Sequence, residues 1–202
     1  MQAFLVLFPL FMIAVMVHEV SHGVAALRLG DPTAKLAGRL TLNPLKHIDP
    51  IGTVALPLVL LFLKAPVFGW ARPVPINPAY LSRPKRDLLW VGAAGPAANF
   101  ALAVVTAWVL QWTQAFLPGW ALAALRYLVL INLVLGTFNL LPIPPLDGSR
   151  VLTSLLPARF ARYMLALERW GFVIVMLLLY VGVVDRFLWP AVSFLVELLG
   201  VK

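Results

Sequence analysis

Three residues near the start of the chain carry the chemistry of a metal-dependent hydrolase. His18, Glu19 and His22 form an H-E-x-x-H sequence. Two histidines four residues apart share one face of a helix, so both imidazoles can bind one Zn²⁺ ion from the same side. The glutamate beside the first histidine is placed to take a proton from an attacking water. The pattern therefore predicts a zinc site with His18 and His22 as ligands and Glu19 as the general base.

The residues around this motif indicate a membrane helix. The motif lies in a hydrophobic run from residue 1 to about residue 29, and no charged residue precedes His18 in it. A bilayer-spanning helix needs about 20 such residues. Ionisable groups inside a membrane helix are costly and usually functional. We therefore expect the chemistry to take place within the membrane.

The composition also points to a membrane protein. The chain is 62% hydrophobic, well above the roughly 45–50% of soluble domains. It contains no cysteine, which excludes disulfides and thiolate metal sites. The net charge of +8 would suit nucleic acid, but the basic residues cluster between apolar runs, where they are typical of membrane flanks. We therefore expect a lipid bilayer, and no nucleic acid, as a partner.

The apolar runs predict an all-α polytopic membrane protein that forms a single integral-membrane domain over residues 1–202. Full spans are expected at about residues 2–29, 88–116, 120–141 and 163–184. Two shorter runs, residues 51–63 and 187–199, contain proline and fit re-entrant or interfacial segments better.

A short membrane-associated β-hairpin is expected after the first helix, because residues 35–43 partly alternate between apolar and polar side chains. Two interpretations of this hairpin are open. Its edge could hold an extended stretch of substrate by β-addition, or it could be a plain surface hairpin.

The positive charges predict which side each loop faces. Basic residues follow the first span and precede the second, at Arg28, Lys35, Arg39, Lys46, Arg83, Lys85 and Arg86. Loops rich in Lys and Arg face the cytoplasm. Residue 30 and Arg83 should then share the cytoplasmic side with Arg159, while the N-terminus and Pro118 lie outside. This topology requires residues 51–63 to return to the side they came from, and it places the active site toward the cytoplasmic side of the cell membrane.

A third metal ligand is expected from the end of the third span. Pro142, Pro144 and Pro145 forbid a regular helix there, so Asp147 is presented from irregular backbone at the depth of the histidines. Asp147 would complete a set of two histidines and one carboxylate. The alternative is that Asp147 is only the N-cap of a helix over residues 148–156.

These motifs together resemble the site-2 protease family, the zinc intramembrane metalloproteases of peptidase family M50. The matching pieces are HEVSH at residues 18–22, GPAANF at 95–100 and NLLPIPPLDG at 139–148. The resemblance implies a three-helix catalytic core, one Zn²⁺ per chain on His18, His22 and Asp147, and Glu19 as general base. It also implies that the substrates are transmembrane segments of other proteins. The chain resembles a small prokaryotic branch that has no recognisable PDZ or CBS domain.

Other polar residues have both a functional and a structural interpretation. Asn99 and Asn139 could contact the substrate carbonyl or the developing oxyanion, or they could make hydrogen bonds between closely packed helices. His47 is expected to be solvated or interfacial and not a ligand. The Pro-rich loop at residues 68–78 resembles a loop near the active site of the family, although its Trp70 also fits an anchor at the membrane interface.

Two other classes of function are weighed against proteolysis. A transporter or metal channel should show a polar file along several helices, whereas the ionisable groups here gather at one depth. An inactive relative would normally have lost one of the four chemical residues, and all are present. The sequence therefore favours a zinc-dependent intramembrane endopeptidase.

Overall fold

The computed structural model describes residues 2–62 and 71–201. Its helices are α1 (Gln2–Arg28), α2 (Thr33–Leu36), η1 (Pro44–Lys46), η2 (Pro50–Ala55), α3 (Leu56–Phe62), η3 (Pro78–Tyr80), α4 (Pro84–Thr113), α5 (Gly119–Asn139), α6 (Asp147–Leu155), α7 (Ala158–Glu168), α8 (Gly171–Tyr180) and α9 (Val183–Leu198). Every regular element in this part of the chain is a helix, which confirms the predicted all-α class.

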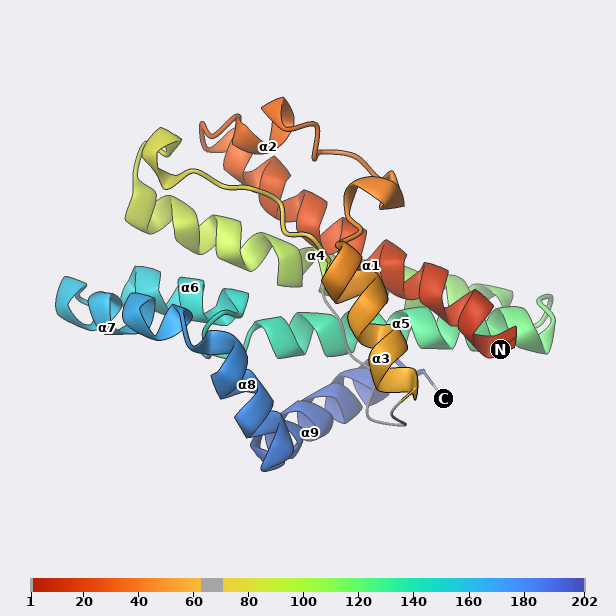
Figure 1. The fold of residues 1–202 in the computed structure, drawn as a ribbon. Helices are drawn as coiled ribbons and strands as arrows, with labels where there is room; N and C mark the ends of the chain where they lie inside the picture. The colour runs from red at the N-terminus through yellow and green to blue at the C-terminus, as the bar shows by residue number, and fades with distance from the viewer. Residues whose placement is uncertain (1, 63–70, 202) are drawn as a thin grey trace.

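Three long helices form the centre of the fold. Helices α1, α4 and α5 are each long and apolar enough to cross a membrane, and each packs against the other two. Figure 1 shows α4 running in the opposite direction to α1 and α5. Large side chains such as Trp108 and Trp112 are 69% and 82% exposed on this bundle, as expected where lipid covers the surface. The chain is therefore a multi-pass membrane protein.

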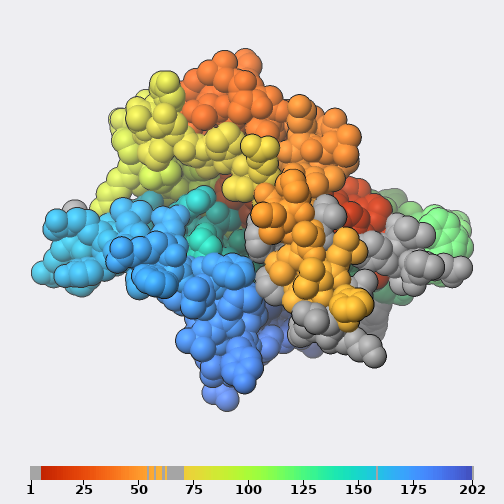
Figure 2. Space-filling view, in the orientation of Figure 1, coloured from red at the N-terminus to blue at the C-terminus, as the bar shows by residue number. Residues whose placement is uncertain are grey.

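The expected fourth span is broken by a sharp bend. Helices α7 and α8 meet at an angle of 77°, so they count as one crossing only if the bent pair spans together. The break follows Glu168, whose carboxylate lies 4.0 Å from the guanidinium of Arg150. Just beyond it, a Cβ on Gly171 would lie 2.7 Å from the backbone nitrogen of Pro145. Figure 2 shows the light-blue and blue residues of the C-terminal helices below the red, orange and yellow residues on this face.

The predicted β-hairpin at residues 35–43 is wrong. These residues continue from α2 through turns toward η1, and the described part of the chain contains no strand. The reason is local. Asn43 precedes a proline, and its side chain accepts a hydrogen bond from the backbone of Leu45, which caps η1. Pro44 at the first helical position favours the start of a helix, and it has no N–H to donate to a β-sheet hydrogen bond.

The segment between α1 and α4 starts and ends at the same end of the bundle. Arg28, at the end of α1, and Arg83 and Arg86, at the start of α4, line one pocket. Within this segment, η2 and α3 cover residues 50–62, which is too short for a regular span. Residues 63–70 lie outside the described residues, so the re-entrant path through them stays a prediction.

Helix α9 begins earlier than the apolar run at residues 187–199 suggests, at Val183. It packs against α5, and Val184, Leu188 and Val192 on α9 share a buried apolar cluster with Leu133 on α5 and Ala107 on α4. This cluster joins the C-terminal helices to the three-helix bundle.

Candidate metal centre

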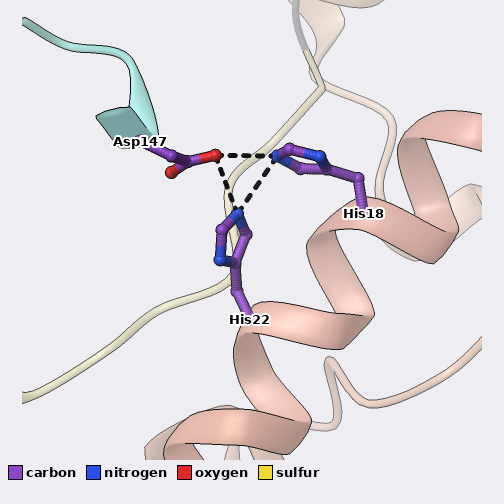
Figure 3. Close-up of side chains that lie close together, drawn as sticks. All are labelled: His18, His22 and Asp147. Atoms are coloured by element: carbon purple, nitrogen blue, oxygen red, sulfur yellow. Dashed lines mark hydrogen bonds and ion pairs between the residues drawn. The ribbon is translucent and has the colours of Figure 1, made fainter. Parts of the chain in front are cut away.

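Three predicted ligands converge on one point between the long helices. Nε2 of His18 and Nε2 of His22 lie 3.0 and 3.1 Å from Oδ2 of Asp147, and 3.1 Å from each other. Figure 3 shows both imidazoles pointing from α1 toward the carboxylate at the start of α6. All three residues are buried, with exposed fractions of 4–6%. They form a group whose ligand atoms could hold one metal ion.

Asp147 reaches this point because the chain between α5 and α6 is irregular. Helix α5 ends at Asn139, and prolines follow at positions 142, 144 and 145. Gly148 then packs closely on the preceding backbone, where a Cβ would collide with the carbonyl of Leu140. Asp147 is the first residue of α6, and Leu146 is its N-cap, without a side-chain capping bond. The capping interpretation of Asp147 is therefore wrong.

The far side of each imidazole fixes where its proton lies. Nδ1 of His22 is 2.6 Å from the carbonyl oxygen of Val91, and Nδ1 of His18 is 2.5 Å from Oδ1 of Asn99. Both partners are acceptors, so each Nδ1 carries a proton, and a neutral imidazole then presents the lone pair of its Nε2. Two imidazole lone pairs and a carboxylate oxygen thus face one another. Such a set of acceptors fits a cation, and the donor types suit Zn²⁺.

Gly95 allows α4 to approach both histidines. A Cβ at this position would lie 2.7 Å from Nε2 of His18 and would collide with Nε2 of His22. A side chain here would therefore enter the space where a metal ion would bind. Glycine is thus required for steric reasons at position 95, the first residue of the segment 95–100 that matches the family motif.

Glu19 lies beside the three ligands and is held by a distant segment. We call residues 71–77 the strap, because they have no regular helix or strand and run along α1. The backbone N–H of Val74 donates to Oε2 of Glu19 at 2.9 Å, and the N–H of Asn77 donates to Oδ2 of Asp31 at 2.7 Å. The sequence-based interpretation of the loop at residues 68–78 as a neighbour of the active site agrees with these contacts, whereas Trp70 lies outside the described residues.

The remaining candidates fall in different places. Asn99 is fully buried and contacts His18, as described above. The side chain of Asn139 donates to the carbonyl of Leu135 in its own helix, at 2.9 Å. His47 was expected to be solvated or interfacial but is fully buried, and its Nε2 lies 2.8 Å from the carbonyl of Thr41. It stands outside the metal-ligand group.

Sequence reasoning did not single out Asn132. Its side chain accepts a hydrogen bond from Nδ2 of Asn99 at 2.8 Å, and it is fully buried. A lone asparagine in an apolar run was the available signal, since buried polar groups require partners.

Comparison with known proteins agrees with this arrangement. Residues 113–181 match the model of Peptidase family M50. Over 183 residues the chain is 38% identical to "Putative zinc metalloprotease YwhC" of Bacillus subtilis, covering 87% of this chain and 80% of that protein. It is 32% identical over 195 residues to Rip2 of Mycolicibacterium smegmatis, covering 95% and 73%. It is 30% identical over 155 residues to "Zinc metalloprotease MJ0392" of Methanocaldococcus jannaschii, covering 77% and 35%. No solved structure matches the chain.

A buried His-His-Asp group between membrane-crossing helices, together with these relatives, defines a membrane metalloendopeptidase. The chain belongs to peptidase family M50, the site-2 proteases.

Proposed function

We propose that this protein is a zinc-dependent intramembrane endopeptidase, which hydrolyses peptide bonds within or near the transmembrane segments of membrane proteins. One observation carries the proposal: Nε2 of His18, Nε2 of His22 and Oδ2 of Asp147 face one another as acceptors in the apolar bundle. Burial of unpaired lone pairs is costly unless a cation neutralises them.

His18, His22 and Asp147 would hold one Zn²⁺ ion per chain. When bound, zinc supplies Lewis-acid chemistry by polarising a carbonyl and lowering the pKa of water. The acceptors Asn99 and Val91 hold a proton on Nδ1 of His18 and His22, so Nε2 is the atom of each imidazole that binds the ion.

Glu19 is the proposed general base. It takes a proton from the attacking water as the oxygen bonds to the scissile carbonyl carbon. It then gives a proton to the amide nitrogen as the C–N bond breaks, so the proton count balances. The N–H of Val74 holds Oε2 of Glu19. This contact fixes the orientation of the carboxylate beside the ligands.

Asn99 is assigned to the orientation of His18 in place of the oxyanion role. Its Nδ2 donates to the carbonyl of Ala14 at 3.1 Å and to Oδ1 of Asn132, so both of its N–H groups have partners. Its side chain is fully buried, which leaves no surface for a substrate. Asn139 has no assigned role in the reaction, because its amide bonds within α5.

We further propose that the protein lies in the cell membrane with the metal centre toward the cytoplasmic side. The end of α1 and the start of α4 carry Arg28, Arg83 and Arg86 at one end of the bundle, and arginine favours the cytoplasmic side. His22 is six residues before Arg28, which corresponds to about 9 Å along a helix. The substrate peptide bond would therefore be cut below the cytoplasmic surface.

Substitution of the base tests the proposal. Purified Glu19→Gln protein should retain zinc. It should cut a model transmembrane substrate at least about 10²-fold more slowly than the wild type, because a general base contributes about that factor. Comparing the membrane proteomes of wild-type and Glu19→Gln cells should reveal a fragment that is absent from the variant. Cleavage by the purified variant at nearly the wild-type rate would exclude Glu19 as the base.

A further inference from the structure

A buried chain of hydrogen bonds links three helices behind the metal ligands. Nδ2 of Asn132 donates to the carbonyl of Leu128 at 2.8 Å, so Oδ1 of Asn132 must face Asn99. Nδ2 of Asn99 donates to this oxygen at 2.8 Å and to the carbonyl of Ala14 at 3.1 Å. Oδ1 of Asn99 therefore faces Nδ1 of His18. The backbone carbonyls thus determine the direction of both amides.

We propose that Asn132 is a positioning residue for the metal centre, which acts through Asn99 on His18. The relay from Asn132 through Asn99 holds the proton of His18 on Nδ1, so that the lone pair of Nε2 points toward the cation. Asn132 is fully buried and does not touch the reacting atoms. This inference rests on the proposed zinc function, and it adds a residue that the H-E-x-x-H and Asp-Gly motifs do not include.

The opposite orientation of Asn99 shows why the relay matters. If the amide of Asn99 turned over, its NH₂ group would face Nδ1 of His18. Nδ1 would then have to accept, and the proton would move to Nε2, where it would point at the other ligands. A protonated Nε2 cannot bind a metal ion. Partners behind a ligating histidine commonly change metal affinity 10- to 100-fold.

His22 provides an internal comparison. Its Nδ1 lies against the backbone carbonyl of Val91, an acceptor that cannot turn over. His18 instead depends on a side-chain amide, which can. Asn132 lies on α5, Asn99 on α4 and His18 on α1. The packing of these three helices therefore determines the orientation of His18 but not that of His22. Changes at Asn132 should therefore affect His18 and leave His22 as it is.

Zinc affinity of purified full-length variants tests the relay. Asn132→Leu keeps the approximate shape of the side chain but removes the oxygen that accepts from Asn99. We expect its zinc dissociation constant to rise about 10-fold, the lower end of the usual range, because Ala14 still accepts from Asn99. Asn132→Asp keeps an acceptor for Asn99 and should recover most of the affinity. Leu133→Ala creates a cavity at the neighbouring position in the apolar core. It should lower the melting temperature without changing the zinc dissociation constant.

The tautomer of His18 gives a second readout that needs no metal. In zinc-free wild-type protein labelled with ¹⁵N-histidine, His18 should carry its proton on Nδ1. Asn132→Leu should weaken the Nδ1–H signal of His18 and leave the Nδ1–H signal of His22 unchanged. Unchanged tautomers and zinc affinity in Asn132→Leu, or an equal loss of affinity in Leu133→Ala, would overturn the positioning role. Failure of the wild type to bind zinc would instead count against the proposed function, while the zinc-free spectra would still decide the relay.

Discussion

Val74 and Glu19 are joined by a hydrogen bond of 2.9 Å from a backbone N–H to Oε2, although they lie 55 positions apart in the chain. The strap that carries Val74 is fixed on both sides of this contact. The N–H of Arg72 donates to the carbonyl of His47 at 2.9 Å, and the N–H of Asn77 donates to Asp31. The orientation of the proposed base thus depends on a segment outside the long helices.

Removing this one donor should slow catalysis without releasing metal. Val74→Pro deletes the N–H that holds Glu19. Val74 stands directly before Pro75, a position that favours the extended backbone that proline tolerates. We expect kcat for a model transmembrane substrate to fall several-fold while zinc content stays at the wild-type level. Val74→Ala keeps the N–H and is the matched control. Equal kcat values for the two variants would show that the contact does not orient Glu19.

Gly95→Ala should abolish metal binding. The added Cβ would lie 2.7 Å from Nε2 of His18, in the space that an ion requires. Helix propensity alone would make the Gly95→Ala protein more stable, since alanine in a helix is favoured over glycine by about 1 kcal/mol. Gly119→Ala is the matched control, because a Cβ there meets nothing within 4 Å. Zinc measured by atomic emission should be lost from the first variant and kept in the second; retention of zinc by folded Gly95→Ala would refute the proposed geometry.

Asp31 should make the anchoring of the strap sensitive to acid. Burial raises the pKa of the Asp31 carboxyl, but hydrogen bonds from Thr33 and Asn77 outweigh burial and lower the pKa below its usual value. The folded protein therefore gains stability above the unfolded pKa of about 3.9, and it loses this stability as the pH falls through the folded pKa.

Melting temperatures of Asp31→Asn and wild type should test this. Either orientation of an asparagine amide would set an NH₂ group against a donor N–H, so the variant should melt lower at pH 7. The gap should narrow below pH about 4, where the Asp31 carboxyl of the unfolded chain becomes protonated, and close as the pH falls through the lower pKa of the folded protein. Asp185→Asn, an exposed residue, should show little change. A gap that is constant with pH would contradict the role of the Asp31 charge.

The topology can be tested with single cysteines, because the natural chain contains none. Cysteines near residue 30, Arg83 and Arg159 should be protected from a membrane-impermeant thiol reagent in intact cells, whereas one near Pro118 should be labelled. Labelling near Arg83 but not near residue 30 would place these positions on opposite sides. It would contradict the shared pocket of Arg28 and Arg83 as well as the re-entrant prediction for residues 51–63.

The convergence of His18, His22 and Asp147 could be predicted because histidine and carboxylate residues are rare in this chain. His18, His22 and Asp147 stand in apolar surroundings where few structural roles explain them, and helical spacing brings the two histidines together. Asn132 was not predicted, because a single asparagine on a helix has many possible partners. Its hydrogen bond with Asn99 forms only through the packing of α4 against α5. The same holds for Val74, whose contribution is a backbone N–H that no side-chain pattern reveals.

Local and long-range contacts explain where the fold departs from the sequence-based expectations. The alternation at residues 35–43 suggested a strand, but Asn43 before Pro44 is a helix-start signal and it decides the structure. The apolar run at residues 163–184 has the length of a span. It bends by 77° near Gly171, where the chain meets Pro144 and Pro145. Hydropathy measures length and apolarity, so it does not report such a contact.

The zinc content of folded Asp147→Ala protein tests the central claim most directly. Purified wild-type protein should contain about one zinc per chain, and Asp147→Ala should contain far less, because a site left with two histidines falls short of the usual three protein ligands. Asp185→Ala is the matched control and should keep its zinc. Circular dichroism should show that all three proteins are folded. Full zinc occupancy in Asp147→Ala would contradict the metal centre described here.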